Sequence, residues 1–152
     1  MNNKVCCFFG HKHLYDSVEV LGTAVRKQVE GLIGEGYCEF LFGGYGLFDE
    51  LCFRVVNDLK RKYPHIKTVY VHAYYKYNDA MFLEYLKKYD ETLYSEIEDK
   101  PLKFAISYRN QKMIEASDFC VFYVAGDMGG AYQAMRYARR MEKNSVNLAE
   151  IL

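Results

Sequence analysis

Residues 39–48 read Glu39-Phe40-Leu41-Phe42-Gly43-Gly44-Tyr45-Gly46-Leu47-Phe48. A short, mostly apolar run of this kind is typical of a buried strand, and the glycines that follow it predict a turn. Apolar residues then recur at positions 48, 51, 52, 55, 56 and 59, which is the spacing of one helix face. The stretch therefore predicts a strand that passes through a glycine turn directly into an amphipathic helix.

The same alternation continues on both sides of this unit. Continuous apolar runs predict further strands at residues 5–9, 68–71 and 119–124, and a last strand at 146–148 closes the sheet. Helical patterns cover about 18–33, 79–88, 104–116 and 130–141, and Asp16 and Glu19 suggest a capping box before the first of them. The pattern predicts a single Rossmann-like, doubly wound α/β domain over residues 1–152, with a mainly parallel sheet of about five strands.

Composition narrows the class of protein. The chain has 152 residues with 20 Lys+Arg and 20 Asp+Glu, so nothing in its net charge favours a dedicated nucleic-acid binder. The apolar fraction of 51% excludes a disordered chain, and no run approaches the length of a membrane span. Five cysteines without framework spacing indicate reduced thiols. We expect a cytoplasmic protein with no membrane partner.

The predicted fold directs attention to four loops. Ligands of open parallel sheets bind beyond the carboxyl ends of the strands, where the strand order reverses. The loops at those ends are residues 10–13, 43–46, 72–77 and 125–130. In the second loop, glycines allow a ligand to approach the backbone, and the N–H groups of the following helix favour phosphate or carboxylate. The alternative is a tight turn that needs positive φ and binds nothing.

The other candidate groups each have a structural alternative. Gly129 and Gly130 open the last predicted helix and suit a second part of a nucleotide, or form an ordinary loop, with Asp127 beside them as a ribose acceptor or a helix cap. Arg109, Asn110 and Lys112 offer polar contacts to phosphate or ribose, unless that helix face is merely solvated.

Histidines, cysteines and tyrosines give weaker signals. His11 and His13 are too few for a metal site, and Cys6 and Cys7 lie inside an apolar run, so we expect no metal and no cofactor. Tyrosines are frequent in residues 70–94. We interpret them as core or as the interface of a homodimer, with base stacking as the alternative.

The order of the motifs resembles the SLOG superfamily, which includes the Smf/DprA proteins, the Lonely-Guy phosphoribohydrolases and small YpsA-like bacterial proteins, the last being the nearest in appearance. The resemblance rests on residues 6–11, 41–49 and 109–118, that is Cys-Cys-Phe-Phe-Gly-His, Leu-Phe-Gly-Gly-Tyr-Gly-Leu-Phe-Asp, and Arg-Asn-x-x-Met with Ser-Asp. It implies a Rossmann-like domain that binds a small nucleotide or nucleotide-derived ligand. The binding residues that it implies are Gly10, His11, Gly43, Gly44, Gly46, Asp49, Arg109, Asn110, Gly129 and Gly130.

One departure from the Lonely-Guy pattern bears on catalysis. Where those enzymes have a threonine and a catalytic glutamate after a glycine loop, this chain has Ala131 and Ala134. Cleavage of the N-glycosidic bond needs a carboxylate to stabilise oxocarbenium-like charge, and alanine has no carboxylate. Glu50 and Glu115 are other carboxylates whose positions the sequence does not fix. We therefore expect a binder or sensor of a nucleotide-like ligand, with an N-glycosidase as the first alternative and a structural or partner-binding module as the second.

Overall fold

A computed structural model describes residues 3–73, 80–94 and 101–152 of the chain. Over these residues six strands form one sheet in the order β4-β3-β2-β1-β5-β6, and every neighbouring pair is parallel. The strands are β1 (Lys4–Gly10), β2 (Tyr37–Phe42), β3 (Lys67–His72), β4 (Glu91–Tyr94), β5 (Phe119–Tyr123) and β6 (Asn144–Asn147). The predicted Rossmann-like α/β class is confirmed.

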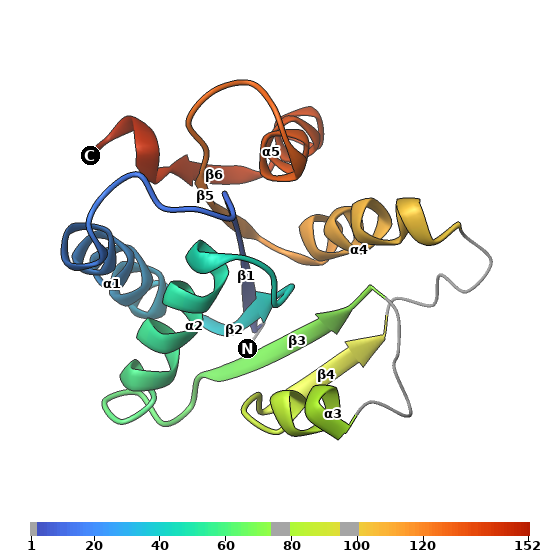
Figure 1. Cartoon of the computed structure of the whole chain (residues 1–152). Helices are drawn as coiled ribbons and strands as arrows, with labels where there is room; N and C mark the ends of the chain where they lie inside the picture. Colours follow the sequence, from blue (N-terminus) through green and yellow to red (C-terminus); the bar gives the residue numbers. More distant parts are fainter. Residues whose placement is uncertain (1–2, 74–79, 95–100) are drawn as a thin grey trace.

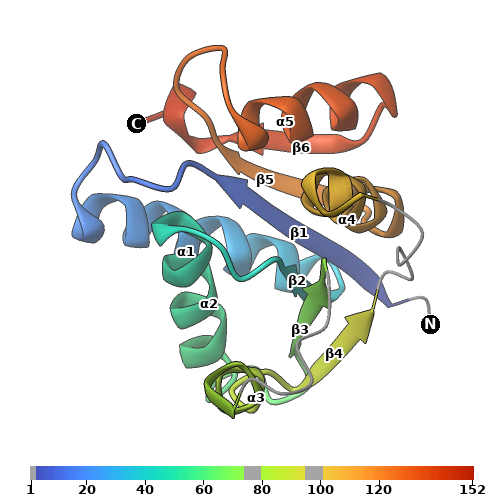
Figure 2. The same cartoon turned by 45° about the vertical axis from the view of Figure 1, so that its right-hand side comes forward.

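Helices cover both faces of the sheet, as Figures 1 and 2 show. Helices α1 (Val18–Gly34) and α2 (Leu47–Leu59) pack on one face, and α4 (Leu102–Ala116) and α5 (Gly130–Arg140) pack on the other. The short α3 (Ala80–Leu86) lies beside β4, and a 3-10 turn (Leu148–Glu150) follows β6. This is the two-sided cover that an all-parallel sheet requires.

Strand β1 is the centre of the core. Its side chains alternate, so that Cys6 and Phe8 join the apolar cluster under α1 and α2, while Cys7 and Phe9 join the cluster under α4 and α5. All four are at most 8% exposed. A strand buried on both faces explains why residues 5–9 read as an uninterrupted apolar run.

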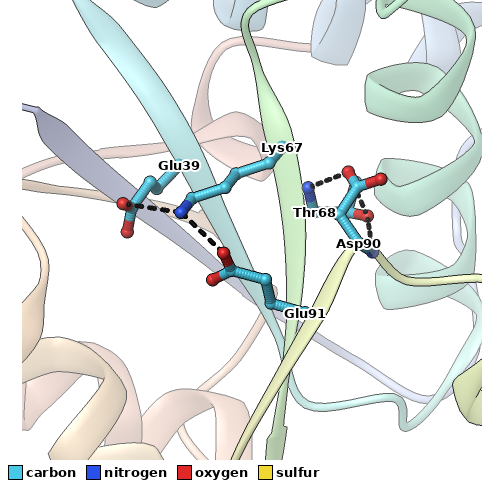
Figure 3. A network of polar contacts seen from close by, with 5 residues as sticks. All are labelled: Glu39, Lys67, Thr68, Asp90 and Glu91. Atoms are coloured by element: carbon cyan, nitrogen blue, oxygen red, sulfur yellow. Dashed lines mark hydrogen bonds and ion pairs between the residues drawn. The ribbon is translucent and has the colours of Figure 1, made fainter.

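The sheet has six strands, close to the predicted count of about five, and the additional strand is formed by residues 91–94, where no strand was predicted. They pair with β3 from Val69–Glu91 to His72–Tyr94. Polar contacts hold the start of this strand, as Figure 3 shows: Lys67 Nζ lies 2.9 Å from Glu91 and 3.3 Å from Glu39. The backbone N–H of Thr68 donates to Asp90 Oδ2 at 2.8 Å. A four-residue edge strand that is held partly by charges gives only a weak signal in the sequence.

Two smaller expectations at the helix ends are corrected. Ser17 is the N-cap of α1, and its hydroxyl accepts from the N–H of Val20 at 3.1 Å, so the predicted capping box does not form. Asp16 instead accepts a 2.6 Å hydrogen bond from the Tyr123 hydroxyl, which ties the loop after β1 to the end of β5. Helix α3 is also shorter than the predicted 79–88.

Part of the tyrosine-rich segment belongs to the core. Tyr70 and Tyr89 are buried, with ring centroids 5.2 Å apart, and the Tyr85 hydroxyl lies 3.0 Å from that of Tyr89. Their packing supports the interpretation of these three as core. Tyr74, Tyr75 and Tyr77, and with them most of the predicted ligand loop at 72–77, lie outside the described residues.

Candidate functional site

A cleft of about 440 Å³ opens at the carboxyl ends of β1 and β2 and beside the loop that follows β5. Strand order reverses between β1 and β5, so the cleft lies where the fold favours ligands. Most of the residues implied by the resemblance line it, namely Gly10, His11, Gly43, Asp49, Arg109, Asn110, Gly129 and Gly130. The structure thus brings together three loops that are far apart in the sequence.

Gly44 and Gly46 face a second cavity instead. This cavity of about 540 Å³ lies on the other side of the glycine turn, where Tyr85 and Lys88 also line it. Lys12 and Asp49 line both cavities. The Gly43–Gly46 turn is therefore a partition with an accessible surface on each side.

Backbone geometry explains the glycines of this turn. Gly44 has φ +72° and Gly46 has φ +93°, a region that other residues rarely adopt. A Cβ at Gly44 would also lie 2.3 Å from the ring of Tyr70. Both glycines are thus required by the fold with or without a ligand, as in the tight-turn alternative.

Asp49 closes the turn from the first turn of α2. Its side chain is buried, Oδ1 accepts from the N–H of Gly43 at 3.2 Å, and Oδ2 accepts from the N–H of Gly44 at 3.0 Å. Burial raises the pKa of this carboxyl to about 7, although the Arg109 guanidinium and the two N–H groups oppose the rise. Desolvation outweighs those favourable contacts, since the charged form gives up its hydration.

Arg109 reaches the same turn from α4 on the opposite face of the sheet. Its Nη1 donates to the carbonyl of Gly43 at 2.9 Å and to that of Val71 at 3.3 Å, and Nε donates to Asn110 Oδ1 at 2.9 Å. The residue is only 5% exposed. These contacts are those of a side chain that supports the turn, and direct contact of Arg109 with a ligand stays a prediction.

The loops after β1, β2 and β5 are fastened to one another. The backbone N–H of Ala125 donates to His11 Nε2 at 2.8 Å, which joins the β1 and β5 loops. The N–H of Leu47 donates to the carbonyl of Lys12 at 3.0 Å, which joins the β1 loop to the start of α2. Gly10 lies so close to the Phe48 ring that a Cβ would be 2.3 Å away. The cleft is therefore largely preformed.

Two helices begin at this edge of the sheet without side-chain caps. Gly46 precedes α2 and Gly129 precedes α5, and neither N-cap makes a side-chain hydrogen bond. The first N–H groups of any helix have no partner within it and carry partial positive charge. A Cβ at Gly129 or Gly130 would meet no atom within 4 Å, so this part of the cleft is open.

Several lining residues were not among the predicted binding residues. Lys12, Tyr15, Tyr45 and Ile106 contribute a cation and apolar surface, and the Lys12 ammonium lies 5.9 Å from the centroid of the Tyr45 ring. Lys12 belongs to a loop that the fold prediction had placed at the correct edge. Tyr45 likewise belongs to the predicted 43–46 loop, whereas Tyr15 and Ile106 lie outside the four predicted loops and carried no signal in the sequence.

The carboxylates that the sequence left unplaced do not enter the cleft. Glu50 lines the second cavity, and Glu115 accepts from the Tyr137 hydroxyl at 2.8 Å. Ala131 lines the cleft, whereas Ala134 is buried in the cluster under α5. Asp49 is the one carboxylate among the described residues that line the cleft.

The described part of the chain lacks both a metal-binding group and a membrane-spanning helix. No three His, Cys, Asp or Glu side chains gather there as a metal-binding group. None of the helices in these ranges has the length and apolar character that crossing a membrane requires. All five cysteines are free thiols, and four of them are buried.

Fold and site together define a Rossmann-like α/β domain with a glycine-lined cleft at its topological switch point. The chain belongs to the YpsA family, described as the YspA SLOG family, whose pattern matches residues 3–151. The resemblance seen in the sequence is thus confirmed. None of the curated proteins compared with the chain matches it.

Two solved structures have a similar fold. DNA processing protein A (DprA) from Helicobacter pylori, reported for its single-stranded DNA binding mode, has a TM-score of 0.65 and 16% identity over 93% of this chain and 63% of its own. DprA from Streptococcus pneumoniae has a TM-score of 0.66 and 15% identity over 94% of this chain and 49% of its own. The chain spans about half to somewhat under two thirds of these proteins.

Proposed function

We propose that the cleft binds a small nucleotide or nucleotide-derived ligand, without Lonely-Guy-type hydrolysis. The observation that carries the proposal is the convergence of glycine-bearing loops from β1, β2 and β5 on one cleft at the switch point. Glycines allow a ligand to approach the backbone closely, and the uncapped start of α5 favours an anionic group.

The charge and the walls of the cleft support this ligand class. Lys12 and Arg109 bring positive charge to it, and His11 and His13 bring ring nitrogens, against the single carboxylate of Asp49 among the described lining residues. Apolar surface from aromatic side chains and Ile106 suits a flat base. A site that joins apolar walls to a few cationic groups fits a phosphorylated, aromatic molecule better than a neutral sugar.

The proposed lack of hydrolysis rests on where the carboxylates lie. Neither Glu50 nor Glu115 lines the cleft, and Asp49 has both oxygens engaged by the glycine turn. One observation favours the hydrolase alternative: a carboxyl with a pKa of about 7 is suited to general acid–base chemistry. Chromatographic assay of base release from nucleoside monophosphates and ADP-ribose decides between them. Turnover that is abolished in Asp49→Asn would establish the hydrolase.

The direct test of binding is a thermal shift with AMP, adenosine and adenine. At 100 times its dissociation constant a ligand adds about 2.7 kcal/mol to the free energy of unfolding. We expect AMP to raise the melting temperature and adenine to leave it unchanged. If no nucleotide or nucleotide derivative changes the melting temperature, the partner-binding module becomes the better reading.

A matched pair of variants locates the phosphate. Gly130→Pro removes one N–H at the first position of α5, where proline is well tolerated, while Gly130→Ala keeps the N–H and adds a Cβ in open space. Loss of a hydrogen bond to a charged group costs about 1.5–3 kcal/mol. AMP should therefore bind at least tenfold more weakly to the proline variant alone. Equal affinity of the two variants would place the phosphate elsewhere.

Single-stranded nucleic acid is a second candidate ligand. It is favoured by the likeness to H. pylori DprA and by three exposed arginines, Arg136, Arg139 and Arg140, on or at the end of α5. The neutral net charge argues for the smaller ligand. Fluorescence anisotropy with an oligothymidylate, at two salt concentrations, tests it, since phosphate contacts make binding strongly salt-dependent. Salt-sensitive binding tighter than that of AMP would favour the oligonucleotide.

Assembly and location complete the proposal. We propose a homodimer in the cytoplasm, where the five free thiols would stay reduced. Light scattering coupled to size exclusion measures the oligomeric state directly, and a monomer at all concentrations would reject the dimer.

A further inference from the structure

The two N–H groups at the start of the glycine turn are already occupied from within the chain. The two oxygens of the Asp49 carboxylate accept from two successive amides, Gly43 at 3.2 Å and Gly44 at 3.0 Å. Two oxygens of a phosphate would make the same pair of contacts with such a turn. The side chain that makes them is 94% buried and comes from the helix that the turn begins, since Asp49 is 6% exposed.

We propose that Asp49 is a positioning residue that acts as the internal anion of the Gly43–Gly46 turn and thereby excludes the anionic group of a ligand from the N–H groups of Gly43 and Gly44. This inference rests on the proposed function, because it assumes that the cleft accepts an anion. It predicts that an anionic group avoids the N–H groups of Gly43 and Gly44, and this limits the orientations in which a ligand can bind in the cleft.

Arg109 completes the arrangement from the other side of the same peptide. Its guanidinium donates to the Gly43 carbonyl at 2.9 Å, so the turn is held by an anion at its N–H groups and a cation at its carbonyl. Buried charges persist only when they are paired and hydrogen-bonded. A ligand phosphate at Gly43 and Gly44 would have to displace a buried carboxylate and leave it unpaired, or bind next to its negative charge.

The protonation state of Asp49 should control this exclusion. A protonated carboxyl is neutral and has one O–H donor, so it accepts from the two turn N–H groups more weakly than the carboxylate does. The pKa of about 7 places this change in the neutral range. The titratable groups that face Asp49 from the surrounding elements, or share a cavity with it, are Arg109, Lys88, Cys52, Tyr85, Tyr89, Lys12, His11, His13 and Glu50.

Sulfate titration followed by amide NMR tests the proposal on the full chain, because the charge of sulfate does not change near neutral pH. At pH 8 we expect the Gly43 and Gly44 amide signals of the unmodified protein to be insensitive to sulfate. In Asp49→Asn the same two signals should shift with sulfate, since the carboxylate charge is gone. Asp58→Asn, a change of the same kind at an exposed position near the end of α2 that lines neither cavity, is the matched control and should behave like the unmodified protein.

A pH series on the unmodified protein is the second measurement and needs no folded variant. With a pKa near 7, the protonated fraction of Asp49 rises from about one tenth at pH 8 to about nine tenths at pH 6. Apparent affinity scales with the competent fraction, so sulfate should bind at Gly43 and Gly44 about tenfold more tightly at pH 6. The asparagine variant has no carboxyl at this position, and where it folds it should lack this tenfold change.

Three results would overturn the inference. One is a sulfate response of the Gly43 and Gly44 amides in the unmodified protein at pH 8 as large as in Asp49→Asn. The second is a variant whose two amides do not respond, and the third is an affinity at these amides that is flat between pH 8 and pH 6. If AMP raises the melting temperature in any of these cases, the proposed function is retained and only the proposed role of Asp49 is rejected. If neither AMP nor sulfate binds, the proposed function and the role of Asp49 are both rejected.

Discussion

Replacing Asp49 by asparagine should change how the stability of the protein depends on pH. The folded-state pKa of Asp49 is about 7, against about 3.9 for an unfolded aspartate. Between these values the folded state holds more protons than the unfolded state, so the free energy of unfolding falls as pH rises. Stability that is fully present below pH 4 is therefore lost as pH rises through 7.

The size of the effect follows from the two pKa values. Three pH units at about 1.4 kcal/mol each give a total of about 4 kcal/mol, of which about 2.5 kcal/mol falls between pH 5 and pH 8. The asparagine variant does not titrate and lacks this loss. Its stability relative to the unmodified protein should therefore improve by about 2.5 kcal/mol from pH 5 to pH 8.

Urea unfolding followed by far-ultraviolet circular dichroism measures this difference, and the signal does not depend on tryptophan, which the chain lacks. Only the difference between the two proteins is used, so other titrating groups cancel. Asp58→Asn is the control: the hydrogen bond from Arg26 lowers the pKa of Asp58 below its usual value, so this carboxylate is ionised throughout pH 5–8 and the difference should be flat. A flat difference for Asp49→Asn as well would show that burial does not raise its pKa, and a difference of opposite sign would show that Arg109 and the turn amides lower it.

Three further changes test the packing around the cleft by urea unfolding. Gly10→Ala should destabilise the protein by about 1–3 kcal/mol, because the new Cβ would lie 2.3 Å from the Phe48 ring. The control Gly31→Ala lies in a helix and in open space, and should stabilise the protein by about 0.5–1 kcal/mol. Similar changes in stability for the two variants would refute the close approach of Gly10 to Phe48. Arg109→Ala should cost about 3–5 kcal/mol, since it removes the buried cation that favours the Asp49 carboxylate and the hydrogen bonds to the carbonyls of Gly43 and Val71. A loss under 1 kcal/mol would contradict the contacts described. Asn147→Ala should cost about 1–3 kcal/mol, because the buried Asn147 amide accepts from the N–H of Val124 and donates to its carbonyl, both at 2.9 Å. An unchanged midpoint of urea unfolding would exclude this pairing.

Most of the fold was predictable because its strands are buried on both faces. Residues 5–9, 40–42 and 119–124 are apolar without interruption, and the structure has strands at all three. Strand β4 was not predicted, since it has only four residues of mixed polarity and its start is held by contacts with Lys67 and Thr68 of β3, a distant part of the chain. Edge strands of this kind owe their position to neighbours rather than to their own sequence.

The candidate site was predictable in outline for a related reason. Glycine turns after apolar strands mark the carboxyl edge of a parallel sheet, so the sequence indicated which loops meet. It did not indicate that Asp49 and Arg109 would be buried and bonded to the turn itself, since a charged side chain in a sequence usually denotes solvent exposure. Nor did it separate Gly43 from Gly44, which face different cavities.

The position of β1 in the sheet has a consequence for synthesis of the protein on the ribosome. One edge of β1 pairs with β2, which follows soon after it in the chain, whereas the other edge pairs with β5. The Val5 N–H also donates to Asp118, which lies 113 residues further along the chain. Contacts of such long range form late, because the intervening chain must first be closed into a loop. Until then the nascent chain presents an unpaired apolar edge at residues 5–9, the kind of edge on which chains aggregate. Protection by chaperones should therefore matter most before residues 119–123 emerge, and the cleft cannot be complete until residues 129–131, which line it, have also been synthesised.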